Sequence, residues 1–442
     1  MKFTFTSLGC PRNLVDSEVM IALLNKKGLE LTFSYEKADL HIVNTCGFIK
    51  EAREEALDVL EEIFKSKKKT AKVIAVGCMV QKFSSMLKEH FPDIHFYLGS
   101  GDIEKIVEAA FSLEKGSIIS DKKSYLSKER SSEVIVTPQN YAYVKIAEGC
   151  KKGCSYCLIP QIKGKLKSKS KDLILKEIDT LLKAGVKEII LIAQDLGDYG
   201  KDLIEKTTLV DLVKDILKIK KYFWLRLLYV YPDEINDELI ELFKTEDRLC
   251  SYVDMPIQHV NDDILKLMKR KVTKKDIINT IEKLRQVPDM IIRTSIIVGF
   301  PSETEAQFEE LIDFIKTNPI DHVGIFKYSN EEGTISSKMP DQISDAIKDK
   351  RYQKLAKVQS KIAIKNKKKL IGKTLYVNIE GYHQETDLLM VGRYQGQAPE
   401  IDTEIIINDP SYVDQFNKLY PVKIVDIKGC DLLGYVDLDD IV

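Results

Sequence analysis

The sequence carries almost no net charge and has no long apolar segment. Its 442 residues include 67 lysines and arginines against 68 aspartates and glutamates, which leaves a formal net charge of −1. A basic surface over the whole chain, of the kind that binds nucleic acid or anionic membranes, is therefore excluded, and any such preference must be local. No stretch of about 18 apolar residues occurs, so we expect no membrane-spanning helix.

The chain also lacks a recognisable secretion signal. Its start, MKFTFTSLGC, resembles a lipoprotein cleavage site, but the stretch before Cys10 is too short and too rich in Thr and Ser for the apolar part of a signal peptide. We therefore expect a cytoplasmic protein whose eight cysteines stay reduced. In that compartment, spaced cysteines more often bind metal or act in catalysis than form disulfides.

Length, composition and periodicity predict a folded α/β protein with several domains. A chain of 442 residues that is 44% hydrophobic is too long for one ordinary core. Short apolar runs alternate with amphipathic helical patterns, such as residues 51–65, as they do in proteins with parallel sheets. We predict a parallel α/β sheet domain over 1–120, a linker over 121–140, a partial (β/α)6 barrel over 141–369 and a small antiparallel β-barrel over 370–442.

The apolar runs give the individual strands of the first two domains. In the first domain they are residues 3–8, 40–45, 73–76 and 94–98. In the barrel they are residues 143–147, 188–193, 223–230, 252–257, 291–298 and 322–328. Six βα repeats suit a barrel-like sheet that is smaller than the eight-fold TIM barrel.

Three cysteines lie on one short loop directly after the first predicted barrel strand. The loop reads Cys150-Lys-Lys-Gly-Cys154-Ser-Tyr-Cys157. Three thiolates in this spacing can hold three irons of a 4Fe-4S cluster and leave the fourth iron without a protein ligand, able to bind a substrate. The alternative is a structural zinc site, but zinc needs four ligands, and the next histidine, His259, lies about a hundred residues further on.

A second set, Cys10, Cys46 and Cys78, stands at the C-terminal ends of three predicted parallel strands. Because parallel strands bring these ends to one edge of the sheet, residues far apart in sequence can become neighbours. The alternative is three small buried residues, since free cysteine is often buried. Beside the first motif we favour a second three-thiolate cluster, whereas Cys250 and Cys430 have no such company and are expected to be structural.

Two arginines, Arg226 and Arg293, each interrupt an otherwise apolar strand of the predicted barrel. Only ten of the 67 basic residues are arginine, so a guanidinium in mid-strand suggests a use of its fork-shaped geometry. Inside the barrel it could bind a carboxylate, and a salt bridge at the barrel rim is the alternative.

The Cys150 loop, with Tyr156 before its last cysteine, resembles the signature of the radical S-adenosylmethionine (SAM) enzymes. The resemblance implies that the free iron chelates the amino and carboxylate groups of SAM, whose cleavage yields a 5′-deoxyadenosyl radical. It also implies that Tyr156 lies over the adenine, with core packing as the alternative, and that the amino group is held near Gln194 and Asp195 at the end of the second barrel strand.

Both cysteine sets, in this order and followed by a small TRAM-like β-barrel, resemble the methylthiotransferases over essentially the whole chain. The start Leu8-Gly-Cys-Pro-Arg-Asn-Leu-Val-Asp-Ser-Glu18 is similar to the branch that acts on an aspartate of ribosomal protein S-twelve (uS12), whereas the tRNA-modifying branch tends to have a Gln-Met-Asn start. Further segments similar to this branch are residues 44–49, 253–259, 293–304, 328–334 and 398–402. The sequence departs from the family where Lys163 and Lys169 replace arginines and where Leu196 replaces Thr or Asn.

The resemblance implies an enzyme that replaces a C–H bond on the aspartate β-carbon with a methylthio group. Its cofactors would be two 4Fe-4S clusters and SAM, and its partner the basic protein uS12, with nucleic acid met only through the ribosome. The sequence identifies neither the electron donor nor the sulfur source.

Two other functions compete with this one. A tRNA methylthiotransferase would need a basic terminal module, but residues 370–442 contain five basic and thirteen acidic side chains, which repel phosphate. A non-enzymatic metal-binding regulator that associates with RNA would not cleave SAM.

Overall fold

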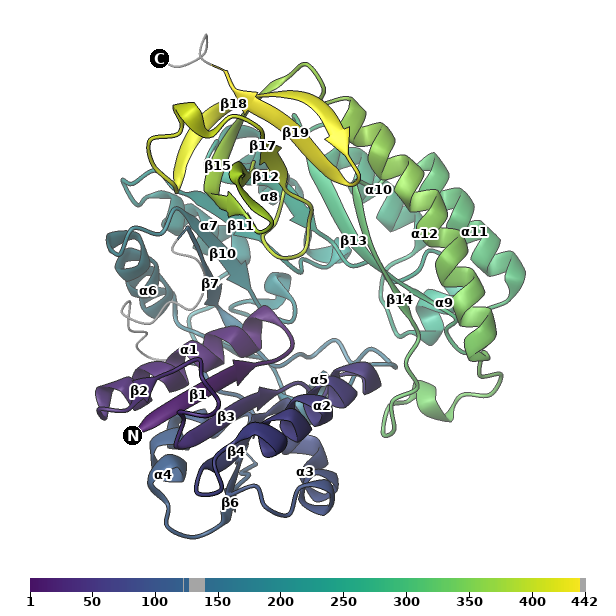
Figure 1. Ribbon diagram of the computed structural model, residues 1–442. Coiled ribbons are helices and arrows are strands. Elements are labelled where there is room, and N and C mark those ends of the chain that lie inside the picture. The colour runs from purple at the N-terminus through teal and green to yellow at the C-terminus, as the bar shows by residue number, and fades with distance from the viewer. Residues whose placement is uncertain (122, 127–139, 438–442) are drawn as a thin grey trace.

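The chain folds into three packed parts that follow one another in sequence (Figure 1). The computed structural model describes residues 1–121, 123–126 and 140–437, so most of the predicted linker 121–140 lies outside the described residues. The N-terminal domain and the C-terminal module lie at opposite ends of the view in Figure 1, and the barrel connects them. No helix in the described part is both long enough and apolar enough to cross a membrane.

A six-stranded parallel sheet in the order β2-β1-β3-β4-β5-β6 forms the N-terminal domain. Its strands are β1 (Lys2–Ser7), β2 (Glu30–Leu31), β3 (Leu40–Thr45), β4 (Lys72–Gly77), β5 (Phe96–Gly99) and β6 (Gly116–Ile118). Its helices are α1 (Pro11–Lys26), α2 (Lys50–Ser66), α3 (Cys78–His90) and α4 (Ile106–Phe111). Helices α1 and α4 pack on one face of the sheet and α2 and α3 on the other, so every residue of the central strand β3 is buried.

The central domain is a second six-stranded parallel sheet, in the order β14-β13-β12-β11-β10-β7. Its strands are β7 (Tyr141–Lys145), β10 (Glu188–Ile192), β11 (Trp224–Leu227), β12 (Leu249–Asp254), β13 (Ile291–Val298) and β14 (His322–Lys327). Its main helices are α6 (Lys171–Lys183), α7 (Leu209–Leu217), α8 (Asp237–Thr245), α9 (Asp262–Leu267), α10 (Lys274–Leu284) and α11 (Glu305–Thr317). The predicted partial (β/α)6 barrel is thus confirmed, with most of these helices in one core on the outer face of the sheet.

The inner face of this sheet is covered at one side and accessible at the other. Strands β7, β10 and β11 are buried throughout, because α1 and the C-terminal module pack against them. Along β13 burial alternates, and the inward-facing residues Arg293, Ser295 and Ile297 stay partly accessible. Phe326, which pairs with Ile297 in register, is 47% exposed. The β13–β14 side of the inner face is therefore the more accessible one.

Five strands close into a small barrel at the C-terminus, in the order β15-β16-β17-β19-β18. They are β15 (Thr374–His383), β16 (Thr386–Arg393), β17 (Ile405–Ile407), β18 (Lys418–Lys428) and β19 (Asp431–Val436), and α12 (Asp345–Lys368) precedes them. All pairs are antiparallel as predicted except β17 with β19, which is parallel.

Candidate functional site

The structure brings Cys10, Cys46 and Cys78 together at the C-terminal edge of the first sheet. Cys10 caps the N-terminus of α1, Cys46 directly follows β3, and Cys78 is the first residue of α3. A side-chain carbon added at Gly9 would lie 2.8 Å from Cβ of Cys46, and Sγ of Cys78 lies 3.6 Å from Oδ1 of Asn13. These three cysteines, which are far apart in sequence, thus form one set, here called the N-terminal trio.

Glycine is required at the turn that presents Cys78. Gly77 has a φ of +103°, a region that residues with side chains rarely adopt. A Cβ atom there would lie 2.3 Å from Oδ1 of Asn44 and 2.8 Å from the carbonyl oxygen of Thr45. The absence of a side chain lets β4 pass directly into α3 beside β3 and keeps Cys78 next to Cys46.

Cys46 and Cys78 are buried and Cys10 is partly exposed, and their surroundings distinguish the three thiols. Burial raises the pKa of Cys78 to about 12 and also raises that of Cys46. Burial acts in the same direction on Cys10, but the Arg12 guanidinium and backbone N–H groups outweigh it and lower the pKa of that thiol. Metal ions bind the deprotonated thiolate, so a bound cluster would displace the three thiol protons here.

The second set, called the loop trio, is Cys150, Cys154 and Cys157, between β8 (Ala147–Glu148) and α5 (Ile159–Ile162). Two backbone N–H groups point at its sulfurs: that of Lys152 lies 3.4 Å from Sγ of Cys150, and that of Ile159 lies 3.4 Å from Sγ of Cys157. Such N–H···S contacts are the kind that stabilise cluster thiolates. Burial raises the pKa of Cys150 to about 11 and that of Cys157 to about 12.

The spacing of the sulfurs fits a cluster better than a single zinc ion. Tetrahedral zinc with Zn–S bonds of about 2.3 Å would hold its sulfurs only about 3.8 Å apart. Among the described residues, the one group of three candidate ligands within 4.8 Å of one another consists of carboxylates, and neither cysteine trio is that compact. Cluster thiolates each bind a separate iron and so stand further apart.

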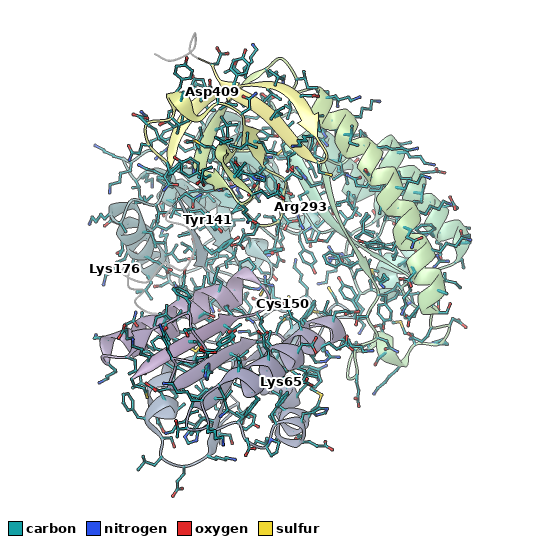
Figure 2. All side chains as sticks on the ribbon, in the orientation of Figure 1. Lys65, Tyr141, Cys150, Lys176, Arg293 and Asp409 are labelled. Carbon is teal, nitrogen blue, oxygen red and sulfur yellow. The ribbon has the colours of Figure 1, made fainter. Side chains whose placement is uncertain are left out.

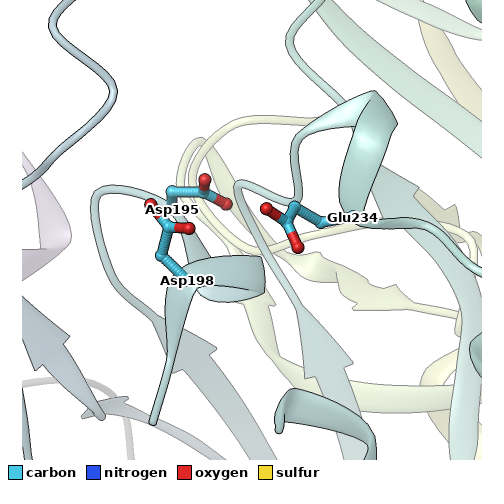
Figure 3. Close-up of side chains that lie close together, drawn as sticks. All are labelled: Asp195, Asp198 and Glu234. Atoms are coloured by element: carbon cyan, nitrogen blue, oxygen red, sulfur yellow. The ribbon is translucent and has the colours of Figure 1, made fainter. Parts of the chain in front are cut away.

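Those carboxylates, Asp195, Asp198 and Glu234, lie close together (Figure 3), and each pairs with Lys152 of the cysteine loop. The Lys152 ammonium lies 3.3 Å from Asp195 and 2.9 Å from Glu234, and Lys201 also pairs with Asp198 and Glu234. Burial raises the pKa of Asp195 to about 6 in spite of Lys152. Because lysines already neutralise this group, we assign it to holding the loop; nothing in the sequence had singled out Lys152 or Glu234.

A buried square of two lysines and two carboxylates joins the two trios. Lys163 pairs with Glu148 at 2.7 Å and with Asp16 at 3.4 Å, and Lys145 pairs with the same two carboxylates. Each of the four side chains is less than 5% exposed. Asp16 belongs to α1 of the N-terminal domain, so the square fastens that domain to the loop trio.

The trios also meet through apolar side chains. Cys78 packs with Leu158, Ile162 and Phe83, and Leu158 directly follows Cys157. In Figure 2, Cys150 lies near the N-terminal domain, while Tyr141 and Arg293 lie beneath the C-terminal module. Both trios therefore stand at the same, C-terminal end of their strands and close to one lumen.

Three family models match successive parts of the chain. They are the uncharacterized protein family UPF0004 over residues 2–99, the radical SAM superfamily over 144–315 and the TRAM domain over 371–436. Relatives named ribosomal protein uS12 methylthiotransferase RimO match nearly the whole chain. The one from Protochlamydia amoebophila is 55% identical, with 98% of this chain and 92% of the relative covered. The one from Syntrophotalea carbinolica is 40% identical, with 98% and 96% covered.

The chain belongs to the RimO family of methylthiotransferases. Membership of the radical SAM superfamily also gives it one 4Fe-4S cluster and SAM as cofactors. The fold agrees: the radical S-adenosylmethionine methyltransferase TsrM from Kitasatospora setae superposes with a TM-score of 0.57 at 12% identity, covering 82% of this chain and 89% of TsrM. The cobalamin-dependent S-adenosylmethionine radical enzyme OxsB gives 0.52 at 12% identity, covering 81% and 56%.

In this RimO-family chain two of the predicted SAM contacts, Tyr156 and Gln194, lie at the cysteine loop: Tyr156 belongs to it, and Asp195, next to Gln194, pairs with Lys152. The ring of Tyr156 packs edge-on against Phe300, with ring centroids 6.4 Å apart, in a small apolar cluster behind the loop. Gln194 follows β10, and among the described residues neither of its buried amide atoms has a hydrogen-bond partner. An unsatisfied amide in this position is suited to a polar ligand.

Arg226 and Arg293 both form ion pairs, which was the alternative to cofactor binding. Arg226 is fully buried, donates to Glu188 at 2.5 Å and to the carbonyl oxygen of Gln395 at 2.8 Å, and so faces the C-terminal module. Arg293 pairs with Asp254 at 3.0 Å but stays 13% exposed on the accessible side of the lumen. Only Arg293 is placed where a ligand could reach it.

Proposed function

We propose that this chain is a radical SAM enzyme of the cytoplasm that transfers a methylthio group to the β-carbon of an aspartate of ribosomal protein uS12. The observation that carries the proposal is the meeting of two cysteine trios at one barrel lumen. The names of the full-length relatives support the reaction and the substrate. A ribosomal substrate in turn favours the compartment where ribosomes are made.

Each trio is proposed to hold three irons of a 4Fe-4S cluster, and the N-terminal trio supplies the second cluster. When bound, one cluster supplies the electron for SAM cleavage and the other supplies the sulfur. Around them the protein excludes water, because Leu158 and Ile162 are fully buried between the trios.

The SAM molecule is proposed to lie between the loop trio and three side chains. Gln194 offers its unsatisfied amide, Arg293 a guanidinium on the accessible side, and Tyr156 a ring beside the loop. Arg226 is left out because it is fully buried and donates to Glu188 and to the carbonyl oxygen of Gln395, and we assign it to docking the C-terminal module.

The charge of the C-terminal module favours a protein substrate over tRNA. Residues 370–442 contain thirteen acidic and five basic side chains, and such a surface attracts a basic protein and repels a phosphate backbone. The tRNA methylthiotransferase is therefore the second candidate, with the same cysteine chemistry and a less suitable surface.

Anaerobic reconstitution with iron and sulfide tests the proposal. We expect about eight irons per chain in the wild type and about four when either trio is replaced by alanine, whereas Cys250→Ala, a buried cysteine outside both trios, should keep about eight. With SAM, reductant and uS12, mass spectrometry should show a methylthio adduct on one aspartate, and both trio variants should lose it.

Each other outcome identifies a different function. A methylthio group on tRNA and none on uS12 would favour the second candidate. Iron binding without any 5′-deoxyadenosine would favour the non-enzymatic regulator. About four irons in the wild type would mean that one trio is not a cluster site.

A further inference from the structure

Arg12 occupies the space between the two trios. It follows Cys10 by two residues at the start of α1, and its Nη1 donates to the carbonyl oxygen of Ala193, at the end of β10, at 2.7 Å. Its charge acts on thiols of both sets, since it lowers the pKa of Cys10 and acts in the same direction on Cys157. Arg12 is thus a cation that both candidate clusters share.

No carboxylate neutralises this guanidinium. Among the described residues, no Asp or Glu forms an ion pair with Arg12, whereas Arg226 and Arg293, the arginines of the barrel strands, each pair with a buried acid. Lys163, the other cation near the N-terminal trio, is likewise paired with Glu148. A partly buried arginine without a carboxylate partner can accept a carboxylate from outside the chain.

The contacts of Arg12 use only part of its five N–H donors. The face of the guanidinium stacks on the ring of Tyr229, with the carbon atom of the group 5.1 Å from the ring centroid. Nη1 donates to the carbonyl oxygen of Ala193, and the guanidinium also forms a hydrogen bond with the Cys10 thiol. The remaining N–H groups form a planar fork of the kind that binds a carboxylate through two parallel hydrogen bonds. Tyr229 itself has a φ of +68°, an uncommon backbone conformation that turns this residue toward the site.

We propose that Arg12 binds the side-chain carboxylate of the target aspartate and so selects aspartate as the residue to be modified. This inference rests on the proposed function. The β-carbon is bonded directly to the carboxylate carbon, so a two-bond clamp on the carboxylate fixes the reacting carbon between the clusters. The side chain of Arg12 is partly accessible, as a substrate-binding group must be.

The test compares uS12 with a uS12 variant that has asparagine at the target position. The reconstituted full-length wild type should bind the aspartate form at least about tenfold more tightly than the asparagine form. Arg12→Met, which keeps the length of the side chain, should bind both forms equally, and Arg12→Lys should restore part of the preference. Lys65→Met, on the exposed surface of α2, is the matched control and should keep the full preference.

Iron content and 5′-deoxyadenosine release without uS12 are measured on the same samples, and we expect Lys65→Met to match the wild type in both. The inference is overturned if Arg12→Met keeps the wild-type preference for aspartate, or if it loses the irons of one trio, which would make Arg12 a support of that cluster. If the proposed function itself is wrong, the wild type will neither bind nor modify uS12, and this result distinguishes that case from the two outcomes for Arg12→Met.

Discussion

At the scale of single residues, the departures from the family pattern have a physical explanation. Lys163 and Lys169 stand where arginines are usual, and both are buried and paired, Lys163 with Glu148 at 2.7 Å and Lys169 with Glu177 at 2.6 Å. Each lysine makes its close contact through one ammonium group. For such a single contact a point charge is as suitable as the fork of a guanidinium. The replacement therefore preserves the charge of each site.

The Lys163 ion pairs predict a large effect of removing that charge. Lys163→Met would leave Asp16 and Glu148 buried with Lys145 as their one ion-pair partner among the described residues, which should lower the free energy of unfolding by about 3–5 kcal/mol. Urea unfolding of the cluster-free protein measures this. Lys165→Met, on the exposed part of the same loop, should change stability by less than about 0.5 kcal/mol. Equal effects of the two variants would show that the buried square contributes nothing.

At the scale of elements, most of the fold and both trios were predictable from the sequence. Strand β13 was predicted over 291–298 and is found there, because an eight-residue run rich in β-branched residues and flanked by turns leaves little choice. The N-terminal trio followed from the rule that parallel strands end at one edge. The partners of Arg226 and Lys152 could not be predicted, since they come from segments far away in sequence and depend on how the domains dock.

The pairing of β1 with β3, which positions Cys10 and Cys46, predicts a pH dependence. His41 on β3 is buried opposite Thr4 on β1, whose Oγ1 lies 2.8 Å from Nδ1 of the ring. Burial, with a smaller effect of nearby lysines, lowers the pKa of His41 to about 4 from its usual 6.5. Below pH 6.5 the unfolded chain therefore binds a proton that the folded chain cannot hold until about pH 4, so stability falls as the pH falls through this range.

The expected loss from His41 is about 1.4 kcal/mol at about pH 5.5 relative to about pH 7.5. Urea unfolding at the two pH values measures it, and His41→Gln should reduce the difference by about that amount. His90→Gln, on the exposed end of α3, should not alter the difference. If the wild type and His41→Gln show the same dependence, the histidine is not responsible for it.

At the scale of the whole molecule, the C-terminal module closes the barrel at the end opposite the trios. Its loop places Ala398 in the core of the lumen, and Glu400 accepts a hydrogen bond from the Tyr141 hydroxyl at 2.6 Å. Arg393 reaches Glu188 at the start of β10 at 2.9 Å. A sequence pattern shows that this module exists, but which end of the barrel it covers depends on these long-range contacts.

Docking of the module through Arg393 predicts a change in cooperativity. Arg393→Met would leave Glu188 with Arg226 as its one remaining partner among the described residues and Glu380 without a cation, at a cost of about 3–5 kcal/mol. Because the cost falls on the contact between module and barrel, we expect calorimetry to show the module unfolding in a separate, earlier transition. Lys428→Met, on the exposed end of β18, should unfold as the wild type does. If Arg393→Met instead unfolds in a single transition at a lower temperature, the barrel and the module form one cooperative unit. The lumen contacts of Ala398 and Glu400 would then be sufficient to hold the two together without Arg393.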